Sequence, residues 1–73
     1  MSQYFKISGD YIELNKLLKA SGLCNTGGQA KMIIKDGLVL VNGEIETRIR
    51  RKLKHGMIIK YNTQSLKVVC KKK

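Results

Sequence analysis

Residues 26–45 read Thr-Gly-Gly-Gln-Ala-Lys-Met-Ile-Ile-Lys-Asp-Gly-Leu-Val-Leu-Val-Asn-Gly-Glu-Ile, and this stretch decides the fold because the apolar period changes within it. Ala30, Ile33 and Ile34 recur at helical spacing and predict the core face of a helix that ends at Gly37. After Gly37 the pattern changes to period two, which is typical of strands. The sequence therefore predicts a helix that leads directly into a strand.

A tight hairpin is predicted at Asn42-Gly43, because these residues readily take the two positive φ angles of a type I′ turn. The flanking strands are expected at Leu38–Val41 and Glu44–Arg50. The second strand alternates, so one of its faces would be apolar and the other charged. Its apolar face would consist of Ile45, Thr47 and Ile49.

Upstream of this stretch the sequence predicts another strand and another helix. The strand is expected at the sheet edge over Tyr4–Ile7, and the helix over Tyr11–Ser21. Asp10 with Glu13 three residues later has the form of a capping box, and Gly22 is a suitable C-cap. The core stripe of this helix would consist of Tyr11, Leu14, Leu17 and Leu18.

Two further strands are predicted near the C-terminus, at Met57–Tyr61 and Leu66–Cys70, with a turn at 62–65 between them. The fold class is therefore α+β, with two helices packed on a small bent antiparallel sheet. A chain of 73 residues is expected to form a single domain, 1–73, with a basic tail at Lys71–Lys73.

The charge of the chain is unevenly placed. Fifteen Lys and Arg against five Asp and Glu give a net charge of +10. Residues 1–47 carry five lysines and five acidic residues and are neutral, so the whole surplus lies in the acid-free stretch 48–73. Self-repulsion on this scale predicts an anionic partner.

Several other classes of protein are disfavoured. No apolar run approaches the roughly 18 residues of a membrane span, and the N-terminus does not resemble a signal peptide, so we expect a cytoplasmic protein without membrane contact. Cys24 and Cys70 stand far apart and form no metal-binding motif, and His55 is the single histidine. No pairing of nucleophile and base is visible, so we expect no catalytic residue, no metal and no cofactor.

Two groups of residues are suited to binding phosphate. Guanidinium groups in the run from Arg48 to Lys54 can fork onto phosphate oxygens. At the start of the second helix, Gly27 and Gly28 leave backbone amides bare, and Gly28 would share a face with two lysines. The candidate RNA-binding residues are Lys16, Lys19, Thr26, Gly27, Gly28, Gln29, Lys31, Lys35, Asn42, Arg48, Arg50, Arg51, Lys52 and Lys54.

Folded RNA is favoured over duplex DNA, because the second helix is short and exposes few side chains that read bases in a major groove. Three of these candidates also have simpler roles. Lys16 and Lys19 also fit a solvated helix face, and Asn42 is first a turn residue. The aromatic residues are few and scattered, which disfavours recognition by stacking.

The chain resembles a known family, the S-4 (S4) RNA-binding domain, which is also called the αL motif. The resemblance covers about Ile12 to Ile59 and rests on the helical segment Leu14–Leu18 and on residues 28–44, followed by Arg48–Leu53 and Gly56. The pattern Ala-Lys…Ile…Gly…Val-x-Val-Asn-Gly is its specific part. The chain resembles a small stand-alone bacterial-type member of this family.

The resemblance implies two helices on an antiparallel sheet, with RNA held across the helical side and the adjoining strand residues. Many relatives begin the second helix with Ser-Arg-Ser, where this chain has Thr26-Gly27-Gly28, so one expected arginine contact is missing. The family turn Pro-Gly-Asp is replaced by His55-Gly56-Met57. The expected function is non-enzymatic binding of structured RNA such as ribosomal RNA.

The expected partners are RNA and a ribosome or ribosomal assembly, and the protein is expected to be a monomer. An alternative is a basic module that binds an acidic protein or another anionic surface. A membrane-surface helix would need a spare apolar face, which neither predicted helix has. An enzyme acting on RNA is disfavoured, because in relatives a separate domain performs the chemistry.

Overall fold

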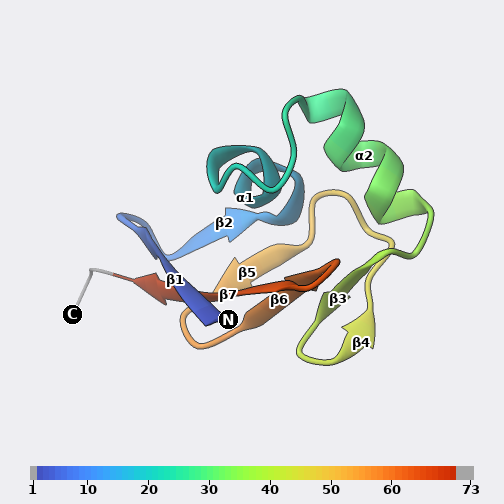
Figure 1. The fold of residues 1–73 in the computed structure, drawn as a ribbon. Coiled ribbons are helices and arrows are strands. Elements are labelled where there is room, and N and C mark those ends of the chain that lie inside the picture. Colours follow the sequence, from blue (N-terminus) through green and yellow to red (C-terminus); the bar gives the residue numbers. More distant parts are fainter. Residues whose placement is uncertain (1, 71–73) are drawn as a thin grey trace.

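A computed structural model describes residues 2–70, in which two helices lie on one side of a set of short strands (Figure 1). The elements in chain order are β1 (Ser2–Ile7), β2 (Tyr11–Glu13), α1 (Leu14–Ala20), α2 (Gly27–Lys35), β3 (Val39–Val41), β4 (Glu44–Ile45), β5 (Lys52–Lys54), β6 (Ile58–Tyr61) and β7 (Gln64–Cys70). The basic tail at Lys71–Lys73 falls outside the described residues.

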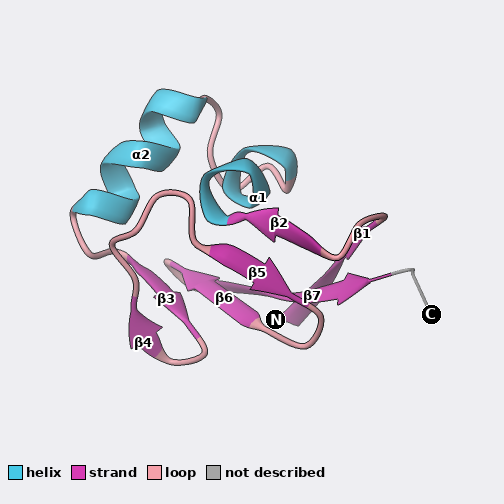
Figure 2. Cartoon of the chain, turned by 180° about the vertical axis from the view of Figure 1, so that it is seen from behind, coloured by secondary structure: helices cyan, strands magenta, loops and turns pink. Residues whose placement is uncertain are grey.

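Five of the strands form one sheet in the order β1-β7-β6-β3-β4, and β2 pairs with β5 in a separate ribbon (Figure 2). Every pair is antiparallel except β1–β7, which is parallel and aligns Ser2–Ile7 with Ser65–Cys70. The α+β prediction is confirmed, and so is the edge position of the first strand. Apolar alternation carries no information on strand direction, so the parallel pair was not predicted.

The core lies between the helices and the strands. Its members are apolar side chains whose burial removes them from water, and a fully buried Leu or Ile contributes about 1.5–3 kcal/mol. The helices supply Leu14, Leu17, Leu18, Ala30, Ile33 and Ile34, and the strands supply Ile7, Val39, Val41, Leu53, Ile59, Leu66 and Val68. The helical stripes predicted from spacing are thus confirmed, except that Tyr11 is exposed.

The predicted start of the first helix is wrong. Tyr11–Glu13 is extended and pairs with Lys52–Lys54, so α1 begins at Leu14 and Glu13 is its N-cap residue. The Glu13 side chain makes no capping hydrogen bond, and the capping box with Asp10 does not form. Pairing with a strand some forty residues away in the sequence supplies backbone hydrogen bonds that no local pattern reveals.

The second strand of the hairpin is also shorter than predicted. β4 comprises Glu44–Ile45, and residues 46–51 form a loop instead of continuing the strand to Arg50. The expected apolar face is not formed there, since Ile45 is 65% exposed and Ile49 is half-buried. The chain leaves the sheet at Glu46 and returns as β5, which pairs with β2.

The predicted turns are confirmed by backbone angles. Asn42 has φ 52° and Gly43 has φ 86°, as a type I′ turn requires. α2 ends just before Gly37, where φ is 75°, and α1 just before Gly22, where φ is 85°. The two C-terminal strands also form, with their turn at Asn62-Thr63.

Candidate nucleic-acid interface

The loop 46–51 is fixed to the rest of the fold by backbone hydrogen bonds. The Leu14 amide donates to the Arg51 carbonyl at 2.9 Å, and the Asn15 amide donates to the Ile49 carbonyl at 3.1 Å. At the other end of the loop, the Glu46 amide donates to the Val39 carbonyl at 3.0 Å. The first amides of α1, which have no partner inside their own helix, are thus satisfied by the arginine-bearing loop.

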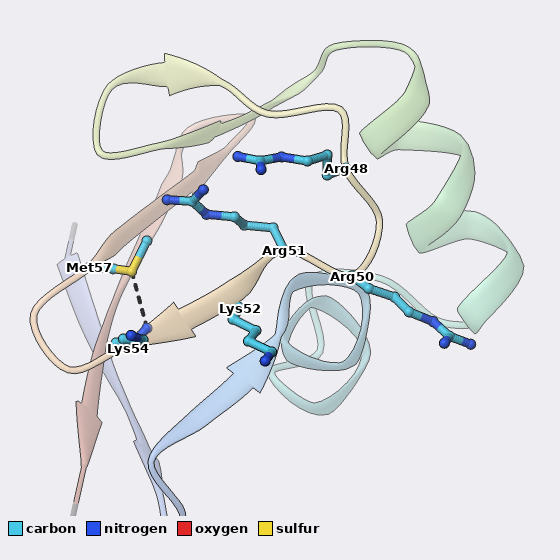
Figure 3. A pocket seen from close by; sticks show the side chains of 6 residues that line it. All are labelled: Arg48, Arg50, Arg51, Lys52, Lys54 and Met57. Atoms are coloured by element: carbon cyan, nitrogen blue, oxygen red, sulfur yellow. Dashed lines mark hydrogen bonds between the residues drawn. The ribbon is translucent and has the colours of Figure 1, made fainter.

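Five cationic side chains from this loop and from β5 border one groove of about 610 Å³ (Figure 3). We call it the basic groove, and its lining residues are Arg48, Arg50, Arg51, Lys52, Lys54 and Met57. Figure 3 shows Arg48 and Arg51 pointing to one side of the loop and Arg50 to the opposite side. The Lys54 amide donates to the Met57 sulfur at 3.1 Å, which joins two of the lining residues.

Glu46 holds the two arginines that point the same way. The Arg48 guanidinium donates from Nε to Glu46 Oε2 at 2.9 Å and from its terminal nitrogen to Oε1 at 3.2 Å. The Arg48 amide donates to Oε2 at 3.0 Å, and Arg51 Nε lies 3.7 Å from Oε1. The Glu46 side chain is only 12% exposed, whereas that of Arg48 is 68% exposed. One shielded carboxylate therefore orients the Arg48 guanidinium by hydrogen bonds and attracts the Arg51 guanidinium through a longer ion pair.

These contacts shift the pKa of Glu46 and the pKa of Arg48 in opposite directions. Side-chain hydrogen bonding from Arg48 holds the pKa of Glu46 below its ordinary value of 4.5, against the opposing effect of partial burial. The same hydrogen bonds raise the pKa of Arg48. The surplus charge at 48–73 is thus partly neutralised from outside that stretch. The sequence predicted Glu46 on the charged face of a strand. Its position two residues before Arg48 was the signal that could have indicated the ion pair.

The start of α2 is capped by side chains. Thr26 Oγ1 accepts from the Gln29 amide at 3.1 Å, and Gln29 Oε1 accepts from the Asn25 amide at 2.9 Å. Within residues 2–70, the amides of Gly27 and Gly28 donate no hydrogen bond. The amides of Gly27 and Gly28, which were predicted to be bare, thus have no partner in this part of the chain, whereas the Gln29 amide is capped.

The other predicted site residues are exposed but lie apart from the lining of the basic groove. Lys31 and Lys35 are exposed one turn apart on α2, and Lys19 is exposed in the last turn of α1. Lys16 Nζ lies 3.8 Å from a Glu13 carboxylate oxygen. Asn42 Oδ1 accepts from the Ile58 amide at 2.9 Å, so its acceptor is used inside the fold.

His55 and Cys70 have partners inside the fold. His55 Nδ1 accepts from the Cys70 amide at 3.1 Å, and the Cys70 thiol lies 3.6 Å from the Asp10 carbonyl. Both cysteines are free thiols, and burial raises the pKa of Cys24.

Over residues 2–70 there is no group of three His, Cys, Asp or Glu side chains that could hold a metal ion. Neither described helix has the length and apolar character needed to cross a membrane.

Known proteins are similar to this chain in both sequence and fold. The family model for the S4 domain matches residues 5–69. YbcJ of Escherichia coli (strain K12) and YbcJ of Shigella flexneri are each 41% identical over 59 residues, which cover 81% of this chain and 84% of theirs. The solution structure of YbcJ from E. coli, described as revealing an αL motif involved in RNA binding, aligns with a TM-score of 0.70 and 37% identity, over 90% of this chain and 85% of that one. The chain therefore belongs to the S4 domain family.

Proposed function

We propose that this protein binds structured RNA, without catalysis, through the basic groove. The observation that supports this most is that five cationic residues line one groove, where Glu46 hydrogen-bonds Arg48 and forms an ion pair with Arg51. Guanidinium groups held in place lose less side-chain entropy when they fork onto phosphate oxygens. The family membership and the αL motif of YbcJ support the same function.

Structured RNA is the proposed class of target, with ribosomal RNA as a candidate within it. A rigid patch of cations suits the phosphates and 2′-hydroxyl groups of a folded RNA surface. Duplex DNA is usually read by a helix that enters the major groove, whereas α2 has only nine residues and its Gln29 side chain is engaged in capping. Lys31 and Lys35 on α2 would add contacts outside the groove.

The test compares three anionic partners at the same salt concentration: an RNA hairpin, the DNA hairpin of equal sequence, and vesicles rich in anionic lipid. We expect the RNA to bind at least about tenfold more tightly than the DNA, a difference of about 1.4 kcal/mol. Equal affinity for RNA and DNA would contradict the RNA preference. Tighter binding to the vesicles would favour the alternative of a general anionic surface.

A further inference from the structure

Tyr11 lies beside the basic groove, although it is distant from the groove residues in sequence. In the β2–β5 ribbon Tyr11 is directly opposite Lys54, and Glu13 is directly opposite Lys52. Residues opposite one another on paired strands share a face, so all four side chains lie on one face of the ribbon. Ile12 and Leu53 occupy the other face, where Leu53 is fully buried.

The Tyr11 ring is available for contact with a ligand. It is 44% exposed, and Lys52 Nζ lies 4.9 Å from the ring centroid in a cation–π contact. Lys52 also borders the basic groove, and in Figure 3 its side chain runs toward β2. One lysine thus connects the groove to the ring.

Tyr11 also forms part of a second hollow of about 240 Å³, whose other lining residues are Ile12, Glu13 and Lys16. One water needs only about 10–15 Å³ of such space, so the hollow is much larger than a single water site. The hollow combines an aromatic wall with a carboxylate acceptor and an ammonium donor, which lie 3.8 Å apart. Aromatic rings and polar groups of this kind bind unpaired nucleobases by stacking and by hydrogen bonds to the base edge.

We infer that Tyr11 stacks an unpaired nucleobase while the adjacent phosphates lie in the basic groove. This inference rests on the proposed function and names its substrate class, which is an RNA helix with a bulged or flipped-out nucleotide. Lys52 serves both parts of the site, since its ammonium group can remain over the ring or move to a phosphate. Fully paired RNA offers the groove its phosphates but leaves the Tyr11 hollow empty.

The test uses two RNA hairpins that differ only by a single bulged adenine, titrated against the full chain. We expect the wild-type protein to prefer the bulged hairpin by about fivefold or more, as stacking of one base provides. Tyr11→Phe should keep this preference and Tyr11→Val should abolish it. Tyr4→Val is the matched control, because Tyr4 is 71% exposed on β1 and borders neither hollow.

A spectroscopic readout replaces the bulged adenine by 2-aminopurine, whose fluorescence falls when it stacks. Quenching on binding, lost in Tyr11→Val and kept in Tyr4→Val, is the expected result. Equal affinity for the two hairpins, or equal weakening of both by Tyr11→Val, would overturn the Tyr11 inference and leave the groove proposal intact. If the wild-type protein bound neither hairpin, the proposed function would fall and this inference with it.

Discussion

At the scale of single residues, the arrangement of Glu46 with Arg48 and Arg51 is what turns a basic loop into an ordered surface. A run of arginines in a flexible loop would lose side-chain entropy on binding, and that cost would reduce affinity. Here the Glu46 carboxylate accepts three hydrogen bonds from Arg48 and lies near Arg51. The loop therefore presents the Arg48 guanidinium in a defined orientation before any ligand arrives, with Arg51 held near the same carboxylate.

This carboxylate predicts a pH dependence of stability. Because the pKa of Glu46 is lowered in the folded protein, its ionised form stabilises the fold fully above the ordinary value of 4.5. The contribution is lost as the pH falls through the lowered pKa. In Glu46→Gln we expect a smaller free energy of unfolding at pH 7 and a difference from wild type that shrinks toward pH 3.

Chemical denaturation at several pH values measures this difference. Glu44→Gln is the matched control, because Glu44 is exposed and forms none of the ion pairs within residues 2–70. If the free energy of unfolding of Glu46→Gln differed from that of wild type by the same amount at every pH, the role assigned to this carboxylate would be contradicted.

At the scale of elements, the capped start of α2 predicts a local energetic effect. The Thr26 hydroxyl accepts from the Gln29 amide at 3.1 Å, so Thr26→Ala leaves that amide without a partner inside the fold. We expect the free energy of unfolding to fall by about 1 kcal/mol. Thr26→Ser keeps the acceptor and should lose much less, and Thr63→Ala in an exposed turn provides the control.

Denaturant unfolding measures the free energy of unfolding of the three variants and tests the role of the cap. If Thr26→Ala and Thr63→Ala lowered stability equally, the cap would have no measurable role. If Thr26→Ser were as destabilised as Thr26→Ala, the hydroxyl would not be the group that acts.

The elements with strong local signals were those that sequence reasoning could predict. Asn42-Gly43 encodes its turn within two residues, and the stripe of Ala30, Ile33 and Ile34 encodes a helical face. Strand β5 was missed because it has three residues and one buried side chain, Leu53. Its partner β2 was read as the start of a helix because the residues that pair with it lie far along the chain.

The candidate site shows the same division. The arginines and lysines of the groove were recognisable from charge alone, because they form one dense run in the sequence. Glu46 and Tyr11 were not, since their positions beside the cations depend on a loop that leaves the sheet and on a pairing between distant strands. The aromatic residues are few and scattered in the sequence, whereas the fold places Tyr11 beside Lys52 of the basic groove.

At the scale of the whole molecule, the separation of charge follows the fold. The first 47 residues are neutral and provide both helices, while the net charge of +10 arises from the rest of the chain. Part of that charge gathers at the basic groove, and part is spread over strands β6 and β7, where Lys60 and Lys67 are exposed. A long-range field from all these cations would attract any polyanion, whereas the proposed groove would hold phosphates in fixed positions.

The salt dependence of binding separates long-range attraction from phosphate contacts in the groove. It is the most direct test of the groove. Each phosphate contact that is lost should flatten the plot of log affinity against log salt by about 0.7–0.9. For an RNA hairpin we expect the double variant Arg48→Ala/Arg51→Ala to flatten the slope by about 1.4–1.8. The control double variant Lys60→Ala/Lys67→Ala removes the same charge outside the groove and should leave the slope near wild type. Equal slopes for the two double variants would contradict the groove as the site of phosphate binding.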